Sequence, residues 1–209
     1  MISHALNIVV NELNAHLAEN YGAGSHQVAL GNLAEGFTSG ASNSGLSREK
    51  LYLSIVNIRE ERTLKNLPNY TRNEAALKAT YENPPVFLNF LILVAATHSN
   101  YTNALLVLSR AIRYFQFRNV FTQDDVAPQS IATTTHPLNQ LDRLETFKFI
   151  FDLYSPTMEE VNHLWGTLGG KQYPFALYMM RMLDLKFEAV QGEKGLITQV
   201  VRDFYHKDR

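Results

Sequence analysis

The hydrophobic pattern of the chain is dominated by one segment without charged side chains. No Asp, Glu, Lys or Arg occurs at the 27 positions from 83 to 109. A membrane-spanning helix needs about 20 predominantly apolar residues, but four consecutive polar residues, Thr97-His98-Ser99-Asn100, interrupt this segment. The pattern therefore predicts a buried core element followed by a second element, and not a membrane span.

The first of these two elements is predicted to be a central strand from Val86 to Thr97. Pro84 and Pro85 favour an extended entry into it, because a residue before proline avoids the helical region. Its nearly continuous apolar character indicates burial on both faces. The second element is predicted to be a helix from Tyr101 to Phe117 that covers the sheet. Its expected apolar stripe is Tyr101, Ala104, Leu105, Leu108, Ile112 and Phe115.

Two more helices follow from helical periodicity and from end signals. The first is expected to begin with Ser3 as its N-cap and to end at Tyr21-Gly22-Ala23-Gly24. Its apolar positions are Leu6, Val9, Val10, Leu13 and Leu17. The other begins within residues 155–160, where a proline and two acids suit a helix N-terminus, and stops at Gly169-Gly170.

The remaining strands are short or alternate in polarity. We predict strands around residues 28–30, over 51–58 and over 146–154, and a final strand in 173–190, where residues 182–190 alternate. A polar connector runs through 123–137. This order of elements predicts an α/β (α+β) fold, with a single mixed β-sheet and helices packed on it.

One domain is expected over residues 1–191, followed by a C-terminal arm over 192–209. Within the domain, the Gly- and Ser-rich residues 36–47 are expected to form a mobile loop. Residues 59–83 are harder to assign, because helix propensity over 74–81 also allows a short helix. An extended arm is favoured, since a connection of this length is usually functional and carries Leu, Pro and Tyr anchors.

Composition and charge exclude several classes of protein. The 209 residues include 19 basic and 20 acidic side chains, without the basic surplus of a nucleic-acid binder. The cluster of Arg110, Arg113 and Arg118 lies near a predicted helix C-terminus, where cations complement the helix dipole. Cysteine is absent, so disulfides, thiolate zinc sites and cysteine nucleophiles are excluded. The N-terminus shows no secretory signal, and we expect synthesis in the cytoplasm.

The candidate metal-binding and phosphate-binding motifs lack other residues that such sites require. Glu160 and His163 have the spacing of a carboxylate-bridged metal site, which also needs a second copy and two more acids. Residues 166–171 resemble a phosphate-binding loop, but Trp165 and Gln172 stand where that loop needs a glycine and a Ser or Thr. A glycine helix stop explains this segment better.

The remaining chemistry-bearing residues form no recognisable site either. Residues 40–44 lack the closing glycine of a nucleophile elbow. The seven histidines, at positions 4, 16, 26, 98, 136, 163 and 206, have no metal-ligand spacing. We therefore predict no catalytic, cofactor-binding or metal-binding residue, and no enzyme.

Four short sequence segments, taken in their order along the chain, resemble those of a known family. They are Leu64-Lys-Asn-Leu-Pro-Asn-Tyr70, Tyr81-Glu-Asn-Pro-Pro-Val-Phe-Leu-Asn89, Ala111-Ile-Arg-Tyr-Phe-Gln116 and Pro156-Thr-Met-Glu-Glu-Val-Asn-His-Leu-Trp165. From residue 1 to about 190, the chain resembles the cap, or tail-terminator, family of extracellular contractile injection systems. It departs from the longer relatives, which carry an additional C-terminal region, and one particle can use two related cap proteins.

The resemblance implies a fold similar to that of phage tail terminators and a structural cap at the baseplate-distal end of a particle. The implied partners are the chain itself, in a homo-hexameric ring or a ring shared with a related cap protein, the inner tube protein and the last layer of the sheath protein. Neither nucleic acid nor membrane insertion is implied. Assembly is expected in the cytoplasm, as part of a particle that can be released.

A closed ring needs a heterologous contact between subunits, and extended arms suit such a contact. We expect one arm of the interface in residues 64–70 and the other in the tail from 196 to 205. The expected interface residues are Leu64, Asn66, Pro68, Tyr70, Phe204 and Tyr205. The alternative interpretation is a soluble adaptor or assembly protein without a stable place in the particle. A small enzyme is disfavoured because catalytic motifs are missing.

Overall fold

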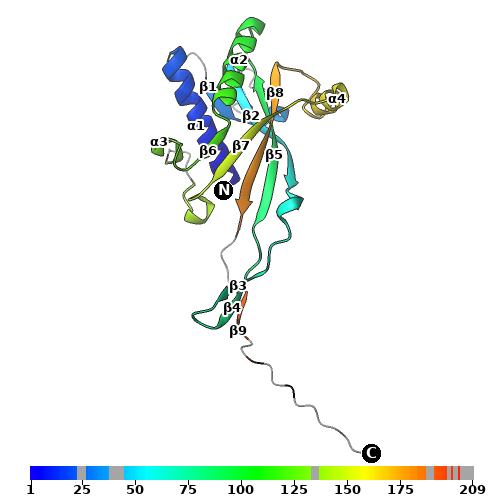
Figure 1. The fold of residues 1–209 in the computed structure, drawn as a ribbon. Helices are drawn as coiled ribbons and strands as arrows, with labels where there is room; N and C mark the ends of the chain where they lie inside the picture. The colour runs from blue at the N-terminus through cyan, green and yellow to red at the C-terminus, as the bar shows by residue number, and fades with distance from the viewer. Residues whose placement is uncertain are drawn as a thin grey trace, which may run out of the picture.

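In the computed structural model of the chain, the described residues are 1–22, 27–37, 45–132, 137–186 and 191–196, together with 199 and 202. They form a body built on a six-stranded sheet and an arm with a three-stranded sheet, which projects from one end of the body (Figure 1). The body strands are β1 (Gln27–Leu30), β2 (Lys50–Glu60), β5 (Val86–Ala96), β6 (Val120–Thr122), β7 (Lys148–Tyr154) and β8 (Phe175–Leu185).

The body sheet has the strand order β1-β2-β5-β8-β7-β6. The edge strand β1 runs parallel to β2, and every other neighbouring pair in this sheet is antiparallel. The sheet is therefore mixed, and the predicted fold class is confirmed. The strand predicted from the uncharged segment, β5, lies at its centre between β2 and β8.

Alternate side chains of β5 are buried on opposite faces of the sheet. Phe90, Ile92 and Val94 belong to the larger hydrophobic cluster, which also contains side chains of helices α1 and α2. Leu93 and Ala95 belong to a smaller cluster with Trp165 of helix α4. Burial on both faces, predicted from the apolar run, is thus confirmed for this half of the strand.

The helices are α1 (Ile2–Tyr21), α2 (Tyr101–Phe117), the short α3 (Pro128–Ile131) and α4 (Met158–Thr167). Single 3₁₀ turns, η1 (Leu33–Glu35), η2 (Arg62–Leu64) and η3 (Gln140–Asp142), lie in the connections. In Figure 1, α1 and α2 lie together against the body sheet, and α4 stands apart from them beyond β8. The helix predicted after Ser155 begins with a capping box between Thr157 and Glu160. It stops before Gly169 and Gly170, which both have positive φ, as predicted.

Two predicted details of the helices are wrong. Ser3 does not cap α1, because the helix already begins at Ile2 with Met1 at the N-cap position. In α2, Tyr101 and Leu105 are exposed, although they were expected in the buried stripe. The helix is rotated because it packs on α1 as well as on the sheet: the Tyr114 ring lies 4.9 Å from that of His16. The buried side chains of α2 are Ala104, Val107, Leu108, Ala111, Tyr114 and Phe115.

The last strands and connections also differ in part from the prediction. The polar connector contains α3, and the short strand β6 precedes it. β8 covers 175–185, earlier than the alternating stretch 182–190, of which residues 187–190 lie outside the described residues. Most of the loop expected at 36–47, namely 38–44, also lies outside them. The division at 191 into a domain and a C-terminal arm stays a prediction.

Residues 59–83 contain no α-helix: β2 ends at Glu60, η2 covers 62–64, and an extended arm follows. β3 (Tyr70–Asn73) and β4 (Lys78–Tyr81) make an antiparallel hairpin, and β9 (Gly192–Gly195) pairs with the other side of β4. The hairpin turn falls within the stretch for which a short helix was considered. We call residues 65–82 and 191–196 the projecting arm.

Candidate interface on the projecting arm

The projecting arm has almost no hydrophobic core of its own. Every residue from 65 to 78 is exposed, and Ala79 is the one buried residue among β3, β4 and β9. A small sheet usually needs an apolar face packed on another layer to be stable. The arm is therefore a surface that stands away from the body and is available for contacts with other chains.

The predicted interface residues of this region are separated by the structure into two places. Pro68 and Tyr70 line a hollow of about 230 Å³ where the arm leaves the body. Leu64 ends η2 and is half-buried, while Asn66 is exposed, and neither of them lines this hollow. Phe204 and Tyr205 lie outside the described residues.

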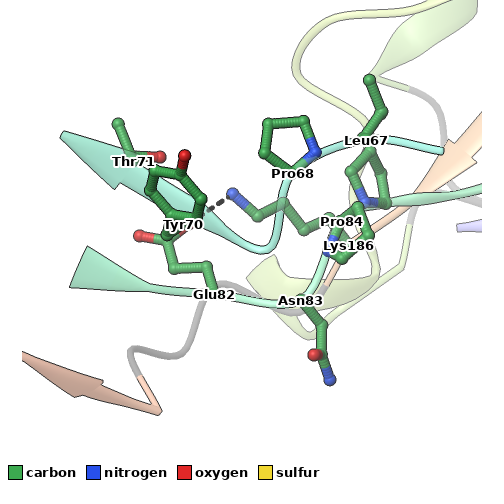
Figure 2. Close-up of a pocket in the computed structure, with 9 residues that line it drawn as sticks. Leu67, Pro68, Tyr70, Thr71, Glu82, Asn83, Pro84 and Lys186 are labelled. Atoms are coloured by element: carbon green, nitrogen blue, oxygen red, sulfur yellow. Dashed lines mark hydrogen bonds and ion pairs between the residues drawn. The ribbon is translucent and has the colours of Figure 1, made fainter. Parts of the chain in front are cut away.

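The hollow is lined by residues from 67–71 and 82–85 and by Lys186. Figure 2 shows Lys186, which follows β8, reaching past Pro68 and Pro84 toward Tyr70 and Glu82. Its Nζ lies 2.7 Å from Oε2 of Glu82. Both side chains are partly exposed, so this ion pair contributes at most about 1 kcal/mol to stability. Its main effect is to join the residue that follows β4 to the residue that follows β8.

A second group of polar contacts, around Glu61, lies at the same end of the body. Glu61 accepts hydrogen bonds from the Thr63 hydroxyl at 2.6 Å and from the Asn89 amide at 2.8 Å. These bonds, the one from the Thr63 hydroxyl first, lower the pKa of the Glu61 carboxyl. The start of the arm is thus tied to the central strand by a charge-assisted bond.

One face of the arm sheet combines aromatic rings with cations. The rings of Tyr70 and Tyr81 face each other across β3 and β4 with centroids 6.3 Å apart. The Arg72 guanidinium lies 5.4 Å from the Tyr70 ring centroid, and the Lys194 ammonium lies 6.0 Å from that of Tyr81. Tyrosine and arginine are enriched at protein interfaces and dominate their hot spots.

Sequence reasoning found Tyr70 but missed Arg72, Tyr81 and Lys194. Alternation in Tyr70-Thr-Arg72 and Ala79-Thr-Tyr81 is the signal for one shared face, but it extends over only three residues in each strand. Lys194 joins this face only because β9 pairs with β4, at a separation of more than 100 residues in the sequence.

The Glu160 and His163 pair, rejected as a metal site, has structural contacts instead. Glu160 accepts hydrogen bonds from the Thr157 backbone N–H and the Tyr154 hydroxyl, and these bonds lower the pKa of its carboxyl. His163 is exposed, and its Nε2 lies 3.9 Å from Oε1 of Glu159. Glu160 and His163 both line a hollow of about 320 Å³ between α4 and the sheet. No group of three potential ligands able to hold a metal ion occurs among the described residues.

The arginines considered for nucleic-acid binding are largely used within the fold. The Arg110 guanidinium lies 4.1 Å from the Tyr21 ring centroid. Arg118 pairs with Glu12 and also donates to the Asp125 carbonyl oxygen. Arg113 is exposed. In the part of the chain that the structure describes, none of the helices has the length and apolar character needed to cross a membrane.

Solved structures with a similar fold come from contractile injection systems. The sheath/tube terminator of the extracellular system PVC, in its extended state, matches with a TM-score of 0.59 at 12% identity. The match covers 100% of this chain and 64% of the terminator chain, so this chain spans less than two thirds of that length. The tube-terminating cap of the anti-feeding prophage matches with a TM-score of 0.48 at 12% identity, over 74% of this chain and 49% of the cap.

The terminator match confirms the predicted tail-terminator-like fold. Among curated proteins, no sequence matches this chain. The family described as the Pvc16 N-terminal domain matches residues 4–199, a range that includes the body and all three arm strands. The protein therefore belongs to the Pvc16 N-terminal domain family, in agreement with its resemblance to the cap family of contractile injection systems.

Proposed function

We propose that the protein is a structural cap of a contractile injection system, which ends the inner tube as a hexameric ring and contacts the last layer of the sheath. The observation that carries this proposal is family membership over residues 4–199, which include the arm as well as the body. The proposed role is structural and not catalytic. Assembly takes place in the cytoplasm, before release of the particle.

The arm supports this role on physical grounds. The end of a growing tube presents unpaired backbone groups that direct the addition of further subunits. A terminator must cover such an end and form a closed ring. A projecting sheet with the exposed residues 65–78 and a face of Tyr70, Tyr81, Arg72 and Lys194 can reach a neighbouring chain while the body stays outside the contact.

The tip of the arm supports the same role. Leu77 lies in the turn between β3 and β4 with φ of +50°, a conformation that large side chains adopt rarely, and it is 55% exposed. Its carbonyl oxygen accepts a hydrogen bond from the Leu196 N–H at 2.9 Å, while the residue itself stays largely open to solvent. In the proposed ring, we expect this exposed apolar side chain to contact a neighbouring chain.

Electron microscopy of the purified chain mixed with its inner tube protein tests the proposal. We expect rings of six copies seated on tube ends, and tubes whose length stops increasing after the chain is added. The double variant Tyr70→Ala/Leu77→Ser should lose this seating. Tyr101→Ser, which changes an exposed residue of α2 on the body, is the matched control and should retain it. Monomers beside bare tube ends would contradict the cap and favour a soluble adaptor.

A further inference from the structure

Each edge of the body sheet is capped in part by a local contact. At β1, the Asn14 side chain of α1 takes the place of a neighbouring strand. Its amide donates to the Val28 carbonyl oxygen at 2.9 Å, and its carbonyl oxygen accepts from the Val28 N–H at 2.8 Å. At the other edge, β6 spans three residues and ends in a turn, where the Thr122 carbonyl oxygen accepts from the N–H groups of Asp125 and Val126. Short, side-chain-capped edges resist pairing with other chains.

The edges of the arm sheet are different. In an antiparallel pair, hydrogen-bonded and non-hydrogen-bonded residue pairs alternate. The Glu82 N–H donates to the Asn69 carbonyl oxygen, and Tyr70 lies opposite Tyr81. Thr71 and Asn73 therefore bond to β4, while the backbone groups of Tyr70 and Arg72 point away from it. Among the described residues, no strand pairs with β3 on that side.

The same reasoning applies to β9 on the opposite side of β4. The Leu196 N–H donates to the Leu77 carbonyl oxygen, so Gly192 and Lys194 bond to β4. The backbone groups of Glu193 and Gly195 therefore face outward. In the described part of the chain, β9 has no strand on this outer side either. Each edge thus offers the backbone of two residues in a strand of four.

We infer that the outer edge of β3 in one copy of the chain pairs with the outer edge of β9 in the next copy. This inference rests on the proposed ring. The two edges lie on opposite sides of one sheet and have equal length, so the same pairing can repeat from copy to copy. A contact between two different surfaces of one chain is heterologous, which is the kind of contact that closes a ring. It also supplies the neighbouring strands that the arm sheet lacks.

Pairing of this kind orders the side chains of the arm. In a continuous sheet, side chains that share a face in one copy stay on that face in all copies. Tyr70, Tyr81, Arg72 and Lys194 then form a band on one side of the ring. Thr71, Asn73, Thr80 and the ion pair between Lys78 and Glu193, whose atoms lie 3.0 Å apart, occupy the other side. The two sides of the ring therefore differ in chemistry.

Proline substitutions at outward-facing positions test the pairing. Arg72→Pro removes an N–H that points away from β4, and proline is tolerated at such edge positions. Glu193→Pro does the same on β9. Each variant should weaken self-association at least about tenfold, because inter-strand hydrogen bonds are lost along the edge. Glu193→Thr keeps the outward N–H of β9, lies on the face away from Tyr70 and Arg72, and is the matched control that should remain assembled. Sedimentation measures the masses against the 23.7 kDa monomer.

Mixing the two proline variants makes the test independent of misfolding. Arg72→Pro retains an intact β9 edge and Glu193→Pro an intact β3 edge, so their mixture should form one-to-one dimers of about 47 kDa, twice 23.7 kDa, that grow no further. Dimers would prove that both variants are folded. A monomeric wild-type chain, unchanged assembly of Arg72→Pro, a loss in Glu193→Thr equal to that in Glu193→Pro, or a mixture without dimers would each overturn the inference.

The inference and the cap proposal can fail separately. If Arg72→Pro still forms rings on tube ends, edge pairing is wrong and the cap stands. If the wild-type chain forms oligomers that depend on Arg72 and Glu193 but ignore tube ends, edge pairing stands and the cap proposal fails.

Discussion

A buried ion pair at the Arg118 side chain holds three segments of the body together. The Glu12 carboxylate on α1 is 7% exposed and accepts hydrogen bonds from Arg118 and, at 3.0 Å, from the Ala127 N–H. We expect Arg118→Met to lower the free energy of unfolding by about 3–5 kcal/mol, because it leaves a buried carboxylate without its cation. Chemical denaturation measures the change.

Two further variants make the cause of that loss specific. Arg113→Met changes an exposed residue of α2 and should stay within about 0.5 kcal/mol of the wild type. Adding Glu12→Gln to Arg118→Met removes the unpaired charge and should recover part of the lost stability. A double variant that is less stable than Arg118→Met alone would show that the charge is not the cause.

The buried hydroxyl of Tyr178 makes the fold sensitive to alkali. Burial raises the pKa of Tyr178 to about 12, whereas an unfolded tyrosine titrates near pH 10. Between these values the unfolded chain releases the proton and the folded chain retains it. The free energy of unfolding should therefore fall, by up to about 1.4 kcal/mol per pH unit for this group, and the stability is fully present below about pH 10.

Tyr178→Phe should make this alkaline decline shallower, as measured by denaturation at a series of pH values between about 9 and 12. Tyr101→Phe, at a residue that is 67% exposed, is the control and should follow the wild-type curve. Parallel curves for Tyr178→Phe and the wild type would contradict the assignment.

Among the secondary-structure elements, β1 depends on a side chain from a helix. Asn14 forms both of its hydrogen bonds with the backbone of Val28. Asn14→Ala should lower the free energy of unfolding by about 1–3 kcal/mol, since two polar groups lose their partners, and should promote aggregation through the exposed edge. Chemical denaturation measures the change in stability, and light scattering during thermal unfolding measures the aggregation. Asn20→Ala, whose amide bonds only within α1, should aggregate no faster than the wild type.

The body elements were predictable because local and global signals agree there. The polar residues 97–100 divide the uncharged segment, and the last of them, Asn100, caps α2 through the N–H groups of Thr102 and Asn103 at 2.9 and 3.3 Å. The rotation of α2 was not predictable, because it depends on packing against α1. Periodicity in one helix does not say which of two apolar flanks faces the core.

The arm was only partly predictable, and for a different reason. Its strands have four residues each, carry one buried side chain and turn at the strained residue Leu77, so neither burial nor a favoured turn sequence marks them. The pairing of β4 with β9 joins segments far apart in the sequence. The candidate face of Tyr70, Arg72, Tyr81 and Lys194 exists only in that register.

For the whole molecule, the arrangement separates stability from assembly. Both hydrophobic clusters lie in the body, while the arm carries the exposed run of residues 65–78. Substitutions in the body should therefore act on folding, and substitutions in the arm on contacts with other chains. The ion pair of Glu82 and Lys186 and the bonds of Glu61 lie between these two regions, where they can fix the direction of the arm.

Two deletions distinguish the arm sheet from the C-terminal tail. Removing residues 192–209 takes away β9 together with Phe204 and Tyr205, and we expect it to abolish oligomers and binding to tube ends. Removing only residues 197–209 leaves β9 and the hydrogen bond from Leu196 to Leu77 intact. This shorter chain should still self-associate, because the edge of β9 that faces the next copy is retained.

Sedimentation and electron microscopy of both deletions provide the measurement. A ring that survives removal of residues 192–209 would contradict a role for β9. Loss of the ring in the shorter deletion would assign the contact to residues 197–209, which include Phe204 and Tyr205, and would contradict edge pairing of the arm. Because the body contains both hydrophobic clusters, the two deletions should remain folded and give circular dichroism spectra like that of the wild type. A loss of assembly then reports on the contact between subunits and not on unfolding.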